Sequence, residues 1–225
     1  MFTFILQLIY PKQCCACHEA LISGEEFICL HCMNALPTYQ FRQEKCNYFH
    51  QIFEGEIPVS KFFALAWFSE KGLMQQIMHQ IKYKGNKPLA QFMGKLLAKA
   101  HLNSLLQQNF DAIIPIPLHP KRFKQRGYNQ AEQIAIGISQ VLGVEVITSS
   151  LIRVKYGESL VSQNRLNRFV QLEKTFALEN NFCEGKNILL FDDTLTTGAT
   201  LISAGKVLKQ GGAKSLSIGC LAVVR

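Results

Sequence analysis

The sequence lacks the features that define several protein classes. No run of about 20 apolar residues is present, which is the length a helix needs to span a bilayer, so no transmembrane helix is predicted. Neither a Walker loop nor a G-x-G-x-x-G segment occurs, which excludes the nucleotide-binding sites that those glycine-rich loops build. Internal repeats, low-complexity tracts and an acidic tail are also missing, which excludes repeat architectures and acidic interaction tails.

Acidic residues are in short supply. The 225 residues include 16 Asp and Glu against 24 Lys and Arg, and the formal net charge of +8 favours anionic partners such as phosphorylated metabolites, nucleic acid or an anionic membrane surface. A hydrophobic content of 48% is typical of a folded protein. The length allows one sizeable core and a small appendage.

The N-terminal segment MFTFILQLIYP is apolar, but it lacks the basic start and small-residue cleavage site of a signal peptide. Phe2, Ile5, Leu6 and Ile9 recur at helical spacing, which predicts a helix that packs on the core, with a surface-lipid contact as the alternative. We therefore expect a cytoplasmic protein, and in that compartment disulfides are uncommon.

Five of the eight cysteines lie in one segment, CCACHEALISGEEFICLHC. Two C-x-x-C pairs separated by a short loop can direct four thiolates to the corners of a tetrahedron, which is the geometry of a closed structural zinc site. The expected ligands are Cys14, Cys17, Cys29 and Cys32. Two alternatives are that Cys15, His18 or His31 replaces one ligand, and that the cysteines stay reduced and only pack.

Strand and helix patterns alternate through residues 59–225, which predicts an α/β domain with a parallel sheet flanked by helices. Residues 1–58 are expected to form a separate module, composed of the N-terminal helix, the cysteine pairs and a polar linker. The predicted strands of the larger domain are residues 61–69, 110–118, 144–154, 186–193 and 215–224. The predicted helices are residues 72–85, 88–106, 129–143 and 197–212.

The stretch ILLFDDTLTTGAT places two acids at the end of a predicted strand, where open α/β sheets bind ligands. The following loop enters a helix, so its backbone N–H groups and the positive end of the helix dipole suit a phosphate. The carboxylates of Asp192 and Asp193 can accept hydrogen bonds from a vicinal diol. A phosphate beside a diol describes a ribose 5-phosphate, and the alternative is an ordinary capped turn between strand and helix.

Two further segments carry candidate binding residues. The strand at residues 112–117 is expected to end in a loop without acids, whose clustered charges suit pyrophosphate or form a solvated basic face. The charges of that loop are Lys121, Arg122, Lys124 and Arg126. The segment KYGESLVSQNRLNRF is long for a connection between strands, which predicts a lid or binding loop. The expected tip of this loop is Gln163, Asn164 and Arg165.

The stretch ILLFDDTLTTGAT resembles the phosphoribosyl-pyrophosphate (PRPP) signature of type I phosphoribosyltransferases, which has aliphatic residues, two acids, two variable residues and Thr-Thr-Gly-x-Thr. The resemblance implies a type I phosphoribosyltransferase-like fold in which Asp192 and Asp193 hold the ribose hydroxyls. It implies a 5-phosphate loop made of Thr194, Thr196, Thr197, Gly198, Ala199 and Thr200. It also implies that pyrophosphate is displaced at ribose C1 with Mg²⁺ bound to the substrate.

The order of motifs along the whole chain is similar to that of the ComF family of competence-associated phosphoribosyltransferase-like proteins. The double C-x-x-C comes first, and the segment HQIKYK follows, with His79, Lys82, Tyr83 and Lys84. The block PIPLHPKRFKQRGYNQAE and the PRPP signature complete the order. This resemblance implies a role in natural transformation, with single-stranded DNA and the DNA-uptake helicase machinery as partners.

Two functions are therefore carried forward. The first is a Mg²⁺-dependent phosphoribosyltransferase with an acceptor that the sequence does not name. The second is a non-catalytic accessory protein that binds single-stranded DNA, with Tyr83 or Tyr128 stacking on a base unless these rings pack in the core. In either case the phosphate contacts are expected from Lys82, Lys84, Lys121, Arg122, Lys124 and Arg126.

Overall fold

A computed structural model of the chain describes residues 11–39, 47–154 and 175–224. The helix expected in residues 1–10 lies outside the described residues. The expected loop tip of Gln163, Asn164 and Arg165 lies outside them as well.

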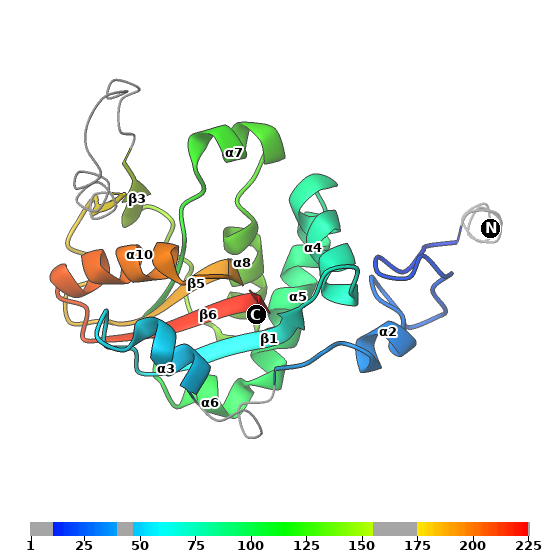
Figure 1. Cartoon of the computed structure of the whole chain (residues 1–225), viewed down its shortest axis with the longest axis horizontal. Coiled ribbons are helices and arrows are strands. Elements are labelled where there is room, and N and C mark those ends of the chain that lie inside the picture. The colour runs from blue at the N-terminus through cyan, green and yellow to red at the C-terminus, as the bar shows by residue number, and fades with distance from the viewer. Residues whose placement is uncertain (1–10, 40–46, 155–174, 225) are drawn as a thin grey trace.

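Four parallel strands form the central sheet (Figure 1). Their order is β1 (Phe62–Phe68), β6 (Ser215–Val224), β5 (Asn187–Leu195) and β2 (Ala112–Pro115). The strands are almost continuously apolar because helices cover both faces of the sheet. The predicted α/β class with a parallel sheet flanked by helices is confirmed.

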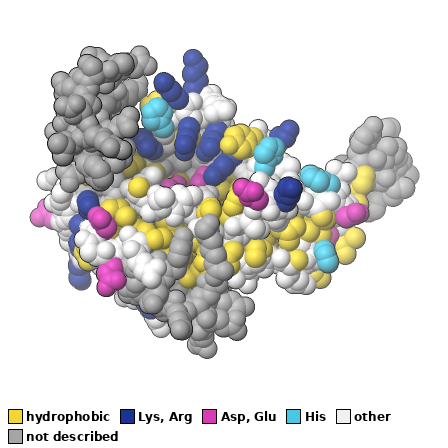
Figure 2. Space-filling view, viewed as in Figure 1, with side chains coloured by type: hydrophobic (Ala, Val, Ile, Leu, Met, Phe, Trp, Pro, Cys, Tyr) yellow, Lys and Arg dark blue, Asp and Glu magenta, His cyan; other side chains and the backbone are white. Residues whose placement is uncertain are grey.

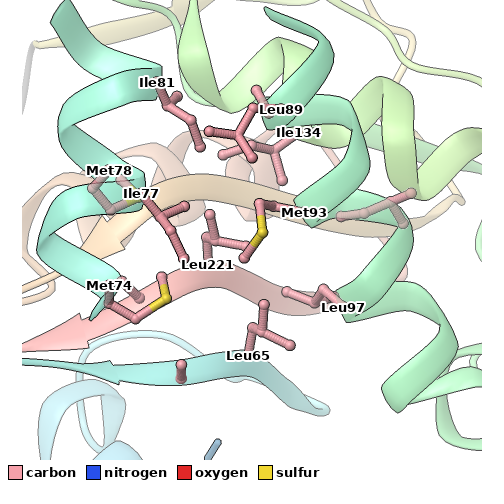
Figure 3. Packing of buried hydrophobic residues seen from close by; sticks show 14 of the residues in the cluster. Leu65, Met74, Ile77, Met78, Ile81, Leu89, Met93, Leu97, Ile134 and Leu221 are labelled. Atoms are coloured by element: carbon pink, nitrogen blue, oxygen red, sulfur yellow. The ribbon is translucent and has the colours of Figure 1, made fainter. Parts of the chain in front are cut away.

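Two layers of helices bury the two faces of the sheet. On one face, buried side chains of α4 (Leu73–Tyr83), α5 (Lys87–Ala100) and α8 (Gln130–Leu142) pack on β5 and β6. Figure 3 shows this layer, where Met74 and Ile77 of α4 lie near Leu221 of β6 and Ile81 lies near Leu89 of α5. The second face is covered by α10 (Ala199–Gln210) and α3 (Asn47–Phe53). Of the helices in the described residues, none has the length and apolarity to cross a bilayer.

The ends of the helices follow local sequence signals. The side chain of Asn129 accepts a hydrogen bond of 3.1 Å from the N–H of Ala131 at the start of α8. Gly143 ends the same helix in the left-handed conformation at a φ of 70°. The predicted start and stop of this helix are confirmed. The short helix α6 (Leu102–Leu106) continues from α5, with His101 between them.

The predicted strand at residues 144–154 is wrong in its extent and in its partner. Val146 forms only an isolated bridge with Ile113 of β2. The later part is β3 (Leu151–Arg153), which pairs antiparallel with β4 (Phe176–Leu178) in a separate two-stranded sheet.

The predicted linker contains a helix, α3, that contributes to the core. The ring of Phe49 stacks on Phe62 of β1 with 3.6 Å between centroids, and Phe53 and Ile57 are buried against the same face of the sheet. The division of the chain at residue 58 stays a prediction.

Candidate functional site

The strand that carries the two acids continues beyond them. β5 runs to Leu195 because β6 pairs along its whole length, with Asp192 opposite Cys220 and Thr194 opposite Ala222. The expectation that the strand ends at the acids is therefore wrong, and both acids lie inside β5. Neighbouring side chains in a strand point to opposite faces, so Asp192 and Asp193 are exposed to different surroundings.

Asp192 and the threonine loop line one small, partly open hollow with a cavity volume of about 30 Å³. All six residues expected in the 5-phosphate loop line it. The lining residues are Asp192, Thr194, Leu195, Thr196, Thr197, Gly198, Ala199, Thr200 and Leu201. The hollow opens at the first turn of α10, where helix N–H groups and the helix dipole favour an anion.

Gly198 shapes the hollow because no other residue fits its position well. It precedes α10 in the left-handed conformation at a φ of 78°, and its carbonyl accepts a hydrogen bond of 2.8 Å from the N–H of Ile202. A Cβ atom at this position would overlap the side chain of Ile52 in α3. Glycine is therefore needed both for the backbone conformation and for the close approach of α3.

Asp193 is held by a lysine from a distant part of the chain. The Nζ of Lys82, in the last turn of α4, lies 3.1 Å from Oδ1 of Asp193 and donates a hydrogen bond of 3.2 Å to Oγ1 of Thr194. Among the described residues, Asp193 does not belong to the lining of the hollow. The expected contact of Lys82 with pyrophosphate or nucleic acid stays a prediction, and in this structure Lys82 is paired with the second acid.

The carboxyl group of Asp192 is difficult to ionise. Burial, followed by the neighbouring charge of Asp193, raises the pKa of Asp192 to about 7. The N–H of Asp193, which donates a 2.7 Å hydrogen bond to Oδ1 of Asp192, opposes this rise, and so do the charges of Lys82 and Arg153. The pair therefore changes its charge near neutral pH.

Arg153 belongs to the surroundings of the acids and was missed by the sequence analysis. Its guanidinium lies over the ring of Phe176, 5.2 Å from the centroid, within the β3–β4 sheet. Burial and then the positive charge of Arg122 lower the pKa of Arg153, while the charge of Asp192 raises it. The signal in the sequence was an arginine among apolar residues of a predicted strand, since such a charge rarely lies there without a partner.

The expected basic loop is a helix. Residues Pro120–Arg126 form α7, in which Nδ1 of His119 accepts a 3.2 Å hydrogen bond from the N–H of Lys121 and Gly127 ends the helix at a φ of 75°. Lys121, Arg122 and Lys124 are exposed on it. Figure 2 shows Lys and Arg side chains gathered along the upper edge of this face, where Figure 1 places α7 and the end of α4. With Lys84 of the α4 end, these three residues are called the basic rim.

Arg126 differs from the basic rim because it is half-buried. It donates a 2.9 Å hydrogen bond to Oε1 of Gln130, and its guanidinium lies 5.6 Å from the ring centroid of Tyr83. It therefore joins α7 to the start of α8 and to the end of α4.

The two candidate stacking tyrosines have different positions. Tyr128 is buried, its hydroxyl donates a hydrogen bond to the carbonyl of Ile81, and burial raises its pKa to about 12. Tyr128 therefore packs in the core, which was the alternative to stacking on a base. Tyr83 is 57% exposed beside the ring of His79, with 5.2 Å between centroids, so it is accessible to a base.

The four expected zinc ligands come together. The sulfur atoms of Cys14, Cys17, Cys29 and Cys32 all lie within 4.8 Å of one another, and Cys17 and Cys29 are 3.7 Å apart. A tetrahedral zinc ion with Zn–S bonds of about 2.3 Å places its sulfur ligands about 3.8 Å apart, so the cluster fits zinc. Within the described residues, Cys15, His18 and His31 do not belong to this group.

Backbone N–H groups prepare this cluster for a cation. Sγ of Cys14 accepts hydrogen bonds from the N–H groups of Ala16 at 3.4 Å and Cys29 at 3.3 Å. Burial alone would raise the pKa of Cys14, but backbone hydrogen bonds bring it down to about 7. Burial and the neighbouring sulfur atoms raise the pKa of Cys32, so the thiols do not all ionise without a cation.

The cysteine cluster is remote from the hollow. Cys29 caps the short helix α2 (Leu30–Asn34), which Figure 1 shows beyond α4 and α5 on the side away from α10. Phe27 contacts Phe92 of α5 with 5.4 Å between ring centroids. Four sulfur ligands leave no position for a reactive water, so the cluster suits a structural metal.

Comparison with known proteins agrees with this architecture. The family model described as the phosphoribosyl transferase domain matches residues 79–225. Competence protein F of Haemophilus influenzae is 32% identical over 114 residues, covering 50% of each chain. Competence protein ComFC of Bacillus subtilis is 27% identical over 158 residues, covering 70% of this chain and 62% of the other. The chain belongs to the ComF family of the phosphoribosyl transferase domain.

Other matches include a relative that covers more of the chain and two solved structures. DNA utilization protein YhgH of Escherichia coli (strain K12) is 23% identical over 225 residues, covering 95% of this chain and 98% of the other. The solved allosteric regulatory enzyme of purine biosynthesis is 17% identical, with a TM-score of 0.46 over 64% of this ComF chain and 30% of the enzyme. Adenine phosphoribosyltransferase from Thermoanaerobacter pseudethanolicus is 15% identical, with a TM-score of 0.38 over 63% and 83% of the two chains.

Proposed function

We propose that this ComF protein binds PRPP with Mg²⁺ and transfers its phosphoribosyl group to an acceptor. The observation that supports this function is that Asp192 and all six residues of the threonine loop line one hollow at the end of β5. The first turn of α10 suits the 5-phosphate, and a carboxylate on the same hollow suits a ribose hydroxyl.

In the proposed reaction the bond between ribose C1 and pyrophosphate breaks, and its electron pair leaves on pyrophosphate. A lone pair of the acceptor forms the new bond at C1. Positive charge develops on the ribose during this exchange, and carboxylates fixed nearby lower the energy of that charge. The acid pair, Asp192 and Asp193, takes this role.

The leaving pyrophosphate needs positive charge. Arg122 on α7 and Arg153 on β3 are close enough to affect each other electrostatically, and Arg153 interacts with Asp192. They are therefore suited to hold pyrophosphate beside the acids. When bound, Mg²⁺ would neutralise further charge of the pyrophosphate, and because Mg²⁺ keeps its waters it would be held mainly by ligand oxygens.

Titration calorimetry with PRPP and Mg²⁺ tests the site. The double variant Asp192→Asn, Asp193→Asn should lose binding. Asp111→Asn is the matched control, because Asp111 bonds the N–H of Asn187 at the opposite end of β5. Wild-type protein that does not bind PRPP would overturn the proposal. Pyrophosphate release with candidate acceptors then tests turnover.

The second candidate function is binding of single-stranded DNA, and one observation favours it. Phe123 is 51% exposed on α7 and Tyr83 is 57% exposed on α4, so two aromatic rings lie among the charges of the basic rim. Such an arrangement stacks bases while it neutralises phosphates. The DNA-uptake helicase machinery remains a proposed partner on the family resemblance alone.

Titration of single-stranded DNA at several salt concentrations tests this function. The logarithm of affinity should fall linearly with the logarithm of salt concentration, and Lys121→Ala should reduce that slope by about 0.7, the value for one contact with a single strand. Lys99→Ala is the control, because Lys99 is exposed at the end of α5, outside the basic rim. A flat salt dependence would rule out the phosphate contacts.

A further inference from the structure

The last turn of α4 connects three parts of the site through three consecutive residues. The carbonyl of Ile81 accepts a hydrogen bond from Tyr128, and the ring of Tyr83 lies against the guanidinium of Arg126. Between them, Lys82 contacts Asp193 and Thr194 of β5. Lys82 is therefore fixed on both sides, and its ammonium group stays at the acid pair.

The position of Lys82 separates it from the basic rim. Its side chain is 21% exposed and that of Asp193 is 14% exposed, whereas the charges of the basic rim are in solvent. An ion pair with this little exposure is screened much less by salt than a surface pair. Lys82 therefore acts on the acids rather than on a ligand at the rim.

Two adjacent carboxylates repel each other, and the second is difficult to ionise without a nearby positive charge. Among the described residues, the groups that act on the acid pair are Lys82 from α4, Arg153 from β3, Tyr128 before α8 and Cys220 from β6. Burial raises the pKa of Tyr128 to about 12 and raises that of Cys220, so both are neutral near pH 7. Lys82 and Arg153 are then the cations near the pair in the described part of the chain, and Lys82 is in direct contact with a carboxylate, that of Asp193.

We propose that Lys82 is the fixed counter-charge of the acid pair, a positioning residue whose positive charge favours the ionised form of Asp192, so that Asp192 accepts hydrogen bonds from the vicinal diol of a ribose phosphate in the hollow. This inference rests on the proposed function for the identity of the ligand. It assigns Lys82 to the acids and leaves pyrophosphate to Arg122 and Arg153. It also predicts selectivity for ribose over 2-deoxyribose, because the two oxygens of one ionised carboxylate can accept hydrogen bonds from both hydroxyls of a diol.

The first experiment needs no ligand. The side-chain carboxyl carbons of Asp192 and Asp193 are followed by NMR between pH 4 and 10 in wild type and in Lys82→Met. The titration of the variant should move upward by about 1 to 3 pH units, the range expected on losing an opposite charge at this distance. Lys82→Arg should restore the wild-type titration. Lys84→Met is the matched control, because it removes the same charge from the exposed end of α4.

The second experiment measures binding of ribose 5-phosphate and 2-deoxyribose 5-phosphate across the same pH range. At pH 7, Lys82→Met should bind ribose 5-phosphate at least tenfold more weakly than wild type and should regain affinity at higher pH. Its preference for ribose over 2-deoxyribose should also fall at pH 7. Lys82→Gln is the second variant if the methionine does not fold, since glutamine keeps a donor for Thr194.

The outcomes separate the inference from the proposed function. A wild-type protein that binds neither sugar phosphate contradicts the proposed function, and the NMR titration still decides the role of Lys82. Identical carboxyl titrations in wild type and Lys82→Met overturn the inference. A loss of affinity that is equal at every pH overturns it too, because that result indicates a purely structural role.

Discussion

Asp192 and Asp193 are neighbours in β5 but have different partners: Asp192 lines the hollow of the threonine loop, and Asp193 forms an ion pair with Lys82 at 3.1 Å. The strand continues through both residues and separates their side chains onto opposite faces. One acid is therefore neutralised by a fixed lysine, while the other faces the ligand site with a raised pKa. The two acids should respond differently to the same substitution.

Asp192→Asn should stabilise the protein at pH 8. The pKa of Asp192 is about 7 in the folded state against 3.8 for an ordinary Asp, so the folded state binds more protons between pH 4 and 7 and loses stability as the pH rises through this window. The variant removes this penalty, which is about 2 to 4 kcal/mol at pH 8 and close to zero at pH 4. Urea unfolding at several pH values measures it. Asp193→Asn is the control and should show no such gain, because it breaks the pair with Lys82.

The sequence predicted the elements whose signals are local. The caps of α8, Asn129 and Gly143, were visible as residue types, and the apolar runs of the sheet strands were read correctly. The basic segment of α7 was interpreted as a loop because its charge obscured its helix signals, which are Pro120 at the start and Gly127 at the end. The end of β5 was misplaced because pairing with β6, and not local composition, extends the strand.

The candidate site was predictable only in part. The threonine loop was found because its residues are contiguous, and they line one hollow. The ion pair of Lys82 with Asp193 joins α4 to β5, which are far apart in the sequence, so no local pattern indicates it. Arg153 was missed for the same reason, since its nearness to Asp192 depends on how the β3–β4 sheet packs. The features of the site that could not be predicted are therefore mainly electrostatic contacts between residues far apart in the sequence.

Zinc binding should depend on four cysteines and not on the fifth. Cys29→Ser removes one sulfur from the cluster and should abolish tight zinc binding, whereas Cys15→Ser should keep one zinc per chain because Cys15 lies outside the cluster. Elemental analysis gives the stoichiometry, and X-ray absorption should show four sulfur neighbours at about 2.3 Å. Loss of zinc from Cys15→Ser would contradict the ligand assignment.

Gly137→Ala should be strongly destabilising because α5 and α8 approach each other closely. A Cβ atom at Gly137 would overlap the backbone carbonyl of Gln91, which cannot move without shifting α5. The expected cost is about 2 to 3 kcal/mol, at the upper end of overpacking. Gly205→Ala in α10 is the matched control, since its Cβ would meet the flexible end of the Ile57 side chain and should cost less. Equal costs in chemical denaturation would show that α5 adjusts freely.

Gly198→Ala should damage both stability and ligand binding. Alanine at a φ of 78° costs about 1 to 2 kcal/mol from backbone strain alone, and the new methyl group would also overlap Ile52 of α3. Gly143→Ala measures the cost of backbone strain alone, because Gly143 has a φ of 70° and open space around it.

The excess cost of Gly198→Ala over Gly143→Ala should shrink in an Ile52→Ala background, since that change removes the obstructing side chain. Affinity for inorganic phosphate, measured on the same variants, should fall wherever the loop is displaced. An unchanged excess in the Ile52→Ala background would show that α3 does not restrict the loop.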